Sequence, residues 1–262
     1  MLGAIIGDIV GSRFEYGGRN VSNFKLFTPE CAFTDDTICT VAIADAIING
    51  AEYSDNLVKW CNKYPFPLGG YGSKFTAWLK SEHQKPYDSW GNGSAMRVSA
   101  IGWAFDSEAK TVKEAIKSAK PTHSHPEGIK GAVCVSNLIF VLRNKTLLKE
   151  DVADYVKEHF DYNMPILSEV KGMHDSCMES VPEAIECFIE AHDFESTIRN
   201  AVELGGDTDT TAAIAGSIAE AYYPIPKEIK EQALKYLDND IKGIITEFFA
   251  KYKSAIIKLL MI

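Results

Sequence analysis

The chain lacks the cysteine spacing and the long apolar runs that define several common protein classes. Its six cysteines are scattered and form no C-x-x-C pair. In a chain of 262 residues this pattern disfavours both a zinc knuckle and a disulfide scaffold. The longest apolar stretch, residues 131–142, is shorter than the roughly 20 residues that a membrane-spanning helix needs. The apolar start lacks the basic leader and cleavage pattern of a signal peptide. We therefore expect a cytoplasmic protein with buried thiols and no membrane partner.

Positive charge is also in short supply. The chain has 27 Lys and Arg residues against 36 Asp and Glu residues, for a net charge of −9, and its isoelectric point is about 5.2. The electrostatic field of an acidic protein repels polyanions, and the sequence contains no cluster of basic residues that would form a local binding surface. No stable nucleic-acid partner is therefore expected. The sequence contains no repeat of fixed period and no low-complexity tract. We expect one domain over residues 1–262 that acts as a monomer.

Alternating strand patterns are missing, whereas apolar residues recur at helical spacing through most of the chain. The predicted helices cover residues 2–14, 36–49, 55–63, 73–81, 93–104, 112–119, 126–143, 147–159, 182–192, 195–204, 208–222, 227–238 and 241–260. Thr111 with Glu114 and Ser180 with Glu183 are typical of capping boxes, and Gly50 is typical of a helix C-terminus. The pattern predicts an all-α fold, a single compact domain of orthogonally packed helices.

Two predicted helices carry unusually small residues. Gly3, Gly7 and Gly11 repeat at four-residue spacing in the first, and the helix over 208–222 is rich in Ala, Gly and Ser. Small residues on one face let two helix axes approach closely. We expect these two helices to lie together at the centre of the core.

Two short islands combine acidic and hydroxyl side chains at predicted helix starts: Thr34-Asp35-Asp36-Thr37 and Gly205-Gly206-Asp207-Thr208-Asp209-Thr210-Thr211. Either island alone is explained as a helix cap. Asp207 and Asp209 would point roughly 200° apart on a regular helix, so both reach one ion only across a loop-to-helix junction. Gly205-Gly206 supplies such a junction, because glycines adopt backbone angles that other residues avoid.

If the islands converge with Glu15, up to five carboxylates meet: Glu15, Asp35, Asp36, Asp207 and Asp209. Their charges repel unless cations neutralise them. Oxygen ligands without Cys or His favour magnesium, manganese or calcium over zinc. The alternative, in which the islands cap two separate exposed helices, stays open at this point.

Two glycine-rich turns also precede predicted helices, one over residues 68–73 and one over 89–97. Such turns expose backbone N–H groups that can bind phosphate, although each can equally be a plain interhelical turn. Two roles stay open for His123: donating to a phosphate, or belonging to the cap of the next helix. His174-Asp175 and His192-Asp193 invite comparison with helical phosphohydrolases that bind metal through a His-Asp pair, but Asp193 is better explained as a helix cap.

Taken together, these motifs resemble one known family. The motifs occur in its order, from residue 3 to about residue 226: Gly7-Asp8-x-x-Gly11 with Glu15, Thr34-Asp35-Asp36-Thr37, Gly70-Tyr71-Gly72, Gly91-Asn92-Gly93-x-Ala95-Met96-Arg97, Thr122-His123-Ser124 and Gly205-Gly206-Asp207-Thr208-Asp209-Thr210. The chain resembles the ADP-ribosylglycohydrolase family, which also includes a jellyfish lens crystallin.

The resemblance implies an all-α fold with a dinuclear magnesium or manganese centre at the base of a cleft. The implied reaction is hydrolysis at C1 of the distal ribose of ADP-ribose conjugates, either ADP-ribosylated proteins or small molecules. By this similarity the metal ligands are Thr34, Asp35, Asp36, Asp207, Asp209 and Thr210, with Asp209 bridging. Glu15 and Asp36 are the candidate catalytic carboxylates, and which is acid and which is base stays open.

The resemblance also implies the substrate contacts. The residues matching the diphosphate part of the cleft are Gly70, Gly72, Ser73, Ser89, Gly91, Asn92, Gly93 and His123, with Trp90 on the adenosine side. The leaving group stays open among arginine, serine, an acyl group and a base. Two other functional hypotheses remain: a non-catalytic ADP-ribose binder or structural protein, and a magnesium-dependent nucleotide phosphohydrolase.

Overall fold

The computed structural model describes residues 1–15, 21 and 23–252, and the predicted all-α fold is confirmed there: the only β-pairing found in this part of the chain is isolated bridges. The α-helices are α1 (Leu2–Gly11), α2 (Asp35–Asn49), α3 (Tyr53–Lys63), α4 (Ser73–Leu79), α5 (Gly93–Met96), α6 (Ser99–Ala104), α7 (Glu108–Ala119), α8 (Pro126–Arg143), α9 (Val152–Phe160), α10 (Cys177–Glu190), α11 (Phe194–Leu204), α12 (Thr208–Tyr222), α13 (Lys227–Ala233) and α14 (Asn239–Lys251). Short 3₁₀ turns cover Lys149–Asp151, Leu167–Glu169 and Leu234–Tyr236.

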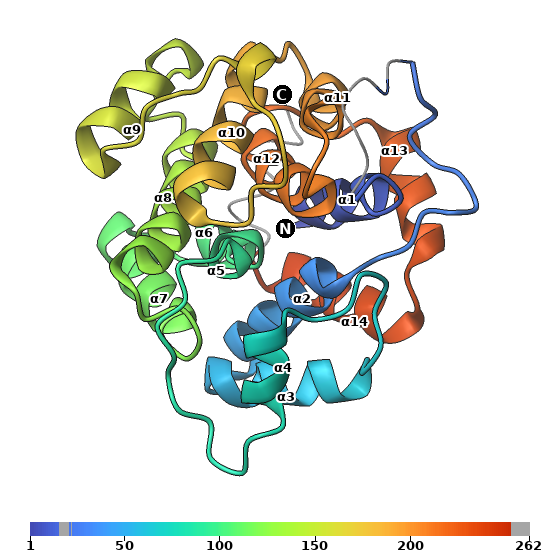
Figure 1. Cartoon of the computed structure of the whole chain (residues 1–262), viewed down its shortest axis with the longest axis vertical. Helices are drawn as coiled ribbons and strands as arrows, with labels where there is room; N and C mark the ends of the chain where they lie inside the picture. Colours follow the sequence, from blue (N-terminus) through green and yellow to red (C-terminus); the bar gives the residue numbers. More distant parts are fainter. Residues whose placement is uncertain (16–20, 22, 253–262) are drawn as a thin grey trace.

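Helices α1 and α12 lie against each other at the centre of the molecule (Figure 1). A Cβ atom added to Gly7 would lie 2.0 Å from the carbonyl oxygen of Ala212, and one added to Gly3 would lie 2.1 Å from that of Gly216. Only glycine fits such a separation, because any side chain would collide with backbone. The predicted close approach of the two small-residue helices is therefore confirmed.

The remaining helices surround this pair. Helix α2 packs against α1 and carries α3 and α14 on its other side, whereas α10 and α11 flank α12 (Figure 1). Helix α8 joins α12 to the group formed by α5, α6 and α7. The starts of α2 and α12 consequently come together, although 173 positions separate Asp35 from Thr208 (208 − 35).

Local signals located some helix ends correctly and others wrongly. Gly50 ends α2 in the left-handed conformation with φ 64°, as expected. The capping box predicted at Thr111 is wrong. Helix α7 starts one turn earlier, where the Ser107 side chain accepts from the Lys110 N–H, and the Thr111 hydroxyl donates back to the Ser107 carbonyl.

The predicted start of the helix at residue 182, with Ser180 as its cap, is also wrong. Helix α10 begins at Cys177, whose N–H donates to the Trp90 carbonyl at 2.9 Å. A distant loop thus satisfies a backbone group that the first turn of a helix leaves unpaired. Local sequence contains no signal for that partner.

A further difference concerns the limits of one helix. The helix predicted over residues 93–104 is two short helices, α5 and α6. The end of the last predicted helix, residues 253–260, lies outside the described residues. Over the ranges that the structure covers, none of the helices combines the length and the apolar character needed to cross a bilayer.

Candidate active site

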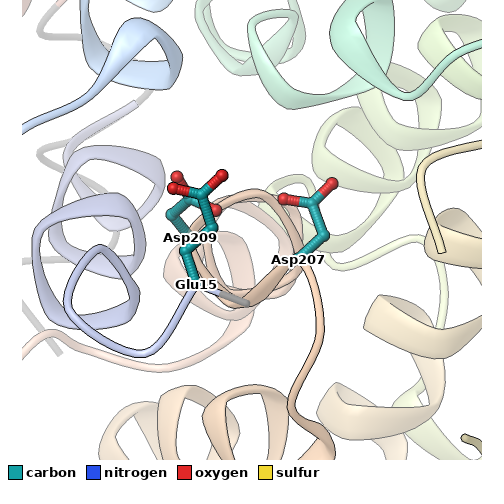
Figure 2. A group of neighbouring side chains, drawn as sticks. All are labelled: Glu15, Asp207 and Asp209. Atoms are coloured by element: carbon teal, nitrogen blue, oxygen red, sulfur yellow. The ribbon is translucent and has the colours of Figure 1, made fainter. Parts of the chain in front are cut away.

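Carboxylates from three places in the chain converge beside the α1–α12 pair. Glu15 follows α1, Asp207 immediately precedes α12, and Asp209 belongs to its first turn. One oxygen from each lies within 4.8 Å of the others. Figure 2 shows Glu15 and Asp209 close together, with the Asp207 carboxylate facing the same space from the side. The first and last parts of the fold therefore meet in one acidic cluster.

The backbone around residues 205–209 explains how Asp207 and Asp209 reach the same space. Gly205 and Gly206 both have φ 75°, in the region that glycine adopts readily. Asp207 itself is not helical, and its side chain makes no capping bond to α12. The predicted loop-to-helix junction is confirmed, and the explanation of Asp207 as a side-chain cap is not.

Asp35 and Asp36 add to this cluster from the start of α2. Both line the same cavity as Glu15, Asp207 and Asp209. The Thr210 hydroxyl donates to Asp36 Oδ2 at 3.1 Å, which links α12 directly to α2. We call this surface, formed by Glu15, Asp35, Asp36, Asp207, Asp209 and Thr210, the acidic wall.

The electrostatics of the acidic wall favour a bound cation. Burial raises the pKa values of Asp35, Asp36 and Asp209 well above the ordinary 3.8, and the neighbouring carboxylates raise them further. Asp36 Oδ1 is buried and has no hydrogen-bond partner within the described ranges. An unpaired oxygen among repelling carboxylates fits a hard divalent cation such as Mg²⁺ or Mn²⁺.

Thr34 occupies a different place from the other predicted ligands. It is fully buried, its side-chain oxygen caps α2 by accepting from the Asp36 N–H, and it does not contribute to the lining of the cavity. Its hydroxyl donates to Asp8 Oδ1 at 2.8 Å. Its role as a metal ligand therefore stays a prediction, and its observed role is to link α2 to α1.

Asp8 is the main residue of this region to which the sequence analysis gave no role. It lies within the otherwise apolar part of α1 and is fully buried. Its carboxylate accepts hydrogen bonds from the backbone N–H and the hydroxyl of both Thr34 and Thr37. Burial raises its pKa to about 6, although these bonds act in the opposite direction. Asp8 thereby fixes the start of α2. The sequence signal for such a role was a single Asp within an otherwise apolar predicted helix.

The cavity has a volume of about 620 Å³, and its other side is built from loops. We call residues 69–73, residues 89–93 and His123 the glycine-rich wall; every one of them lines the cavity. Gly69 and Gly70 have φ 76° and 80°, which explains the paired glycines. The predicted site residues, Thr34 excepted, therefore face one cavity.

Two residues connect the walls. The Asn92 side-chain amide donates to Asp207 Oδ2 at 2.7 Å and to the Ser180 hydroxyl at 3.0 Å. A Cβ atom added to Gly69 would lie 2.6 Å from Glu15 Oε2, so the missing side chain makes room for the Glu15 carboxylate. Asn92, expected to contact substrate, therefore also orients a carboxylate of the acidic wall.

Trp90 stands at the mouth of the cavity. It is 48% exposed, its ring meets His125 edge-on, and the Lys74 ammonium lies 5.5 Å from its centre. A large, accessible aromatic face beside a cation suits stacking on a nucleobase, since the ring buries apolar area on contact. This placement agrees with the contact expected for Trp90, which itself stays a prediction.

His123 lies at the back of the glycine-rich wall. It is 5% exposed, and the Nε2 edge of its ring lies against Gly91 and Gly93. Burial, followed by the charge of Arg97, lowers the pKa of His123 well below 6.5. His123 is therefore neutral at physiological pH and can donate from only one ring nitrogen.

The two His-Asp pairs do not form a metal site with each other. His174 Nδ1 bonds to Glu183 Oε1 at 2.5 Å. Asp193 caps α11 through a reciprocal bond with Ser196, as expected, and the His192 side chain is 84% exposed. These partners account for His174, His192 and Asp193 without a phosphohydrolase centre, whereas Asp175 lines the same cavity as Asp207.

Comparisons with known proteins identify one family. Residues 1–256 match the ADP-ribosylglycohydrolase family. The chain is 26% identical to human ADP-ribosylhydrolase ARH3 over 92% of this chain and 90% of that protein. It is 24% identical to ADP-ribosyl-[dinitrogen reductase] glycohydrolase of Rhodospirillum rubrum over 73% of this chain and 69% of that protein.

A solved structure extends the comparison to the fold. A chain titled "ADP-ribosylglycohydrolase-related protein complex" aligns with a TM-score of 0.69 over 96% of this chain and 95% of its own length. At 21% sequence identity this likeness concerns the fold alone. With a match to the family across nearly the whole sequence, the chain belongs to the ADP-ribosylglycohydrolase family.

Proposed function

We propose that this protein is a magnesium-dependent hydrolase that cleaves the bond at C1 of the distal ribose of ADP-ribosyl conjugates and releases ADP-ribose. The observation that carries the proposal is the convergence of Glu15, Asp207 and Asp209 in one cavity that also has a glycine-rich wall and an aromatic rim. The names of the similar hydrolases support the substrate class.

The acidic wall is the proposed metal site. Asp35, Asp36, Asp207, Asp209 and Thr210 would hold two Mg²⁺ or Mn²⁺ ions, with Asp209 shared between them. When bound, such ions neutralise the carboxylates and supply Lewis acidity toward ribose hydroxyls and water. The close α1–α12 packing fixes the helix that carries Asp209 and Thr210, which limits the reorganisation needed when substrate binds.

Glu15 and Asp36 are the proposed catalytic carboxylates. Hydrolysis at an anomeric carbon passes through a state with positive charge on the sugar, which a nearby carboxylate stabilises. A carboxylate at this position can also take a proton from the attacking water or deliver one to the leaving group. Asp36 is held by Thr210, and Glu15 lies against Gly69 where the two walls meet.

The glycine-rich wall and Trp90 are proposed to hold the ADP part of the substrate. Backbone around the glycines leaves open space beside the cavity, since a Cβ on Gly70 or Gly72 would meet nothing within 4 Å. A diphosphate can approach such backbone closely. Every group invoked here belongs to one chain, so a monomer suffices for the proposed reaction.

The competing functions differ in what they release. A non-catalytic ADP-ribose binder would release nothing, and a nucleotide phosphohydrolase would release AMP or inorganic phosphate. The acidic positions of the family pattern are all occupied here, which favours the enzyme. The panel that tests this consists of ADP-ribosyl-arginine, ADP-ribosyl-serine and O-acetyl-ADP-ribose, assayed for ADP-ribose release with Mg²⁺ and with EDTA.

The panel also identifies the leaving group. We expect Mg²⁺-dependent release of ADP-ribose from at least one conjugate and none in EDTA. Release that persists in EDTA would contradict the metal dependence. Phosphate or AMP as the product would replace the proposal with the phosphohydrolase, and binding of ADP-ribose without turnover of any conjugate would replace it with the binder.

A further inference from the structure

Arg97 is a buried cation next to the glycine-rich wall with an unusual set of partners. It is 1% exposed, lines the cavity, and follows α5 directly. Its Nη2 donates to the Thr122 hydroxyl at 2.8 Å and to the Ser118 carbonyl at 3.3 Å. Its Nε is buried without a partner, and no carboxylate within the described ranges forms an ion pair with it. A buried guanidinium without a counter-ion is costly unless it serves an anion or a hydrogen-bond network.

The bond from Arg97 restricts the Thr122 hydroxyl. A guanidinium can only donate, so the Thr122 oxygen accepts from it. The single hydroxyl proton then needs an acceptor, because Thr122 is fully buried. The remaining partner of that hydroxyl within the described residues is His123 Nδ1 at 2.7 Å.

The same bond then determines the tautomer of His123. If the Thr122 hydroxyl donates to Nδ1, that nitrogen carries no proton, and in a neutral imidazole the proton lies on Nε2. The opposite arrangement, with Nδ1–H donating to Thr122, would leave the hydroxyl proton buried without an acceptor. The lowered pKa of His123 supports the neutral ring.

The Nε2 atom of His123, at the end of these hydrogen bonds, lies beside the cavity. Nε2 lies 3.2 Å from the position of a Cβ on Gly93 and 3.7 Å from that on Gly91, and both glycines line the cavity. We propose that Arg97 is a positioning residue: through Thr122 it holds His123 as the Nε2–H tautomer, which donates a hydrogen bond to a phosphoryl oxygen of the diphosphate. This rests on the proposed function for the identity of the diphosphate, whereas the tautomer does not.

The first measurement is the tautomer of His123 in the ligand-free protein, by ¹⁵N NMR of the ring nitrogens. We expect wild type to carry the proton on Nε2. Thr122→Val removes the hydroxyl while keeping the shape, and Arg97→Met removes the donor, so each should produce a mixture of tautomers. Thr122→Ser should restore the Nε2–H form. The matched control is Thr111→Val, which removes an equally buried hydroxyl from α7, away from the cavity.

The second measurement is the affinity for ADP-ribose by calorimetry in Mg²⁺. Thr122→Val should weaken binding about five- to tenfold, in line with the loss of one hydrogen bond to a charged group. Thr122→Ser and Thr111→Val should stay within about twofold of wild type, because neither removes that bond. The affinity for Mg²⁺ should not change in any of them.

The outcomes distinguish a failure of the Arg97–Thr122–His123 hydrogen bonds from a failure of the proposed function. An Nδ1–H tautomer in wild type, or a Thr122→Val variant that changes neither tautomer nor affinity, would overturn the proposal. Equal losses in Thr122→Val and Thr111→Val would also overturn it, in favour of a general packing effect. A wild type with the Nε2–H tautomer but no affinity for ADP-ribose would overturn the proposed function and the phosphoryl contact, and would leave the Arg97–Thr122 relay standing.

Discussion

The two walls of the cavity differ in what holds them in place: packed helices hold the acidic wall, and a few loop contacts hold the glycine-rich wall. The acidic wall lies on the starts of α2 and α12, which are held by backbone-to-backbone packing of α1 against α12 and by the buried Asp8. The glycine-rich wall consists of loops held by isolated bridges, such as Asp88 with His123 and Gly91 with Ser176. Helix packing fixes position tightly, because whole elements must move together, whereas loops are held by a few contacts each.

This difference has a functional meaning under the proposed reaction. Metal ligands require positions accurate to a fraction of an ångström, and the acidic wall is the more rigidly built of the two. The glycine-rich wall has to accommodate a long, flexible nucleotide, for which open backbone and an exposed ring suffice. Substitutions in the acidic wall should therefore affect turnover or folding, and those at the rim should affect binding.

The largest effect is expected for Asp209→Ala. Losing this proposed metal ligand should reduce turnover by about 10³-fold or more, equivalent to several kcal/mol of transition-state stabilisation. The fold should be retained, because a repelling buried charge is removed. Steady-state ADP-ribose release and thermal melting measure the two quantities. Glu158→Ala, an exposed site on α9, serves as the control; wild-type turnover in Asp209→Ala would contradict the metal site.

Gly7→Ala tests whether helix packing positions the acidic wall. The added methyl would lie 2.0 Å from the Ala212 carbonyl oxygen, so α1 and α12 must separate. We expect destabilisation by about 3 kcal/mol or more, at the upper end for overpacking, measured by urea unfolding. Gly243→Ala on α14, where the new Cβ meets nothing within 4 Å, is the matched control. Equal stability of both variants would show that the close approach is not required.

Magnesium should stabilise the protein, and more strongly at higher pH. Since the pKa values of Asp35, Asp36 and Asp209 are raised, the metal-free folded state holds protons that the unfolded chain has lost. Its stability therefore falls as pH rises from about 3.8 through the raised pKa values. Cations bind the deprotonated wall and offset that loss, by about 2.7 kcal/mol at one hundred times the dissociation constant.

Thermal melting with and without Mg²⁺, at about pH 5 and about pH 7.5, measures this dependence. Potassium chloride at matched ionic strength controls for screening. A shift that is larger at the lower pH would show that the carboxylates are not the binding groups.

Trp90→Ala should have the smallest effect, and this effect should appear in substrate binding and not in the chemical step. Loss of a stacking surface is expected to raise KM about tenfold with kcat nearly unchanged. Phe66→Ala is the matched control, since Phe66 is 93% exposed and does not line the cavity. A fall in kcat without a change in KM would indicate that the rim contributes to the chemical step instead.

Much of the candidate site was accessible from sequence because its motifs are local. Gly205-Gly206 and the acidic residues after them need only a few neighbouring backbone angles to form the junction observed. The roles of Asp8 and Arg97 were not accessible in this way. Asp8 accepts from residues 26 and 29 positions away, and Arg97 donates to a residue 25 positions away, so their partners depend on how helices pack. The start of α10 escaped prediction for the same reason, since its first N–H is satisfied by Trp90.

By itself, the order of residues determined that this chain is helical and that its central pair of helices meets closely, because periodicity and small side chains act over one or two turns. It also determined which acidic and glycine-rich segments stand at helix starts. Only the tertiary structure decided that Glu15, Asp36 and Asp209 share one cavity, that the buried Asp8 fixes the start of α2, and that His123 Nδ1 meets the Thr122 hydroxyl. Such arrangements arise from contacts between segments far apart in the chain, and no local pattern encodes their distances.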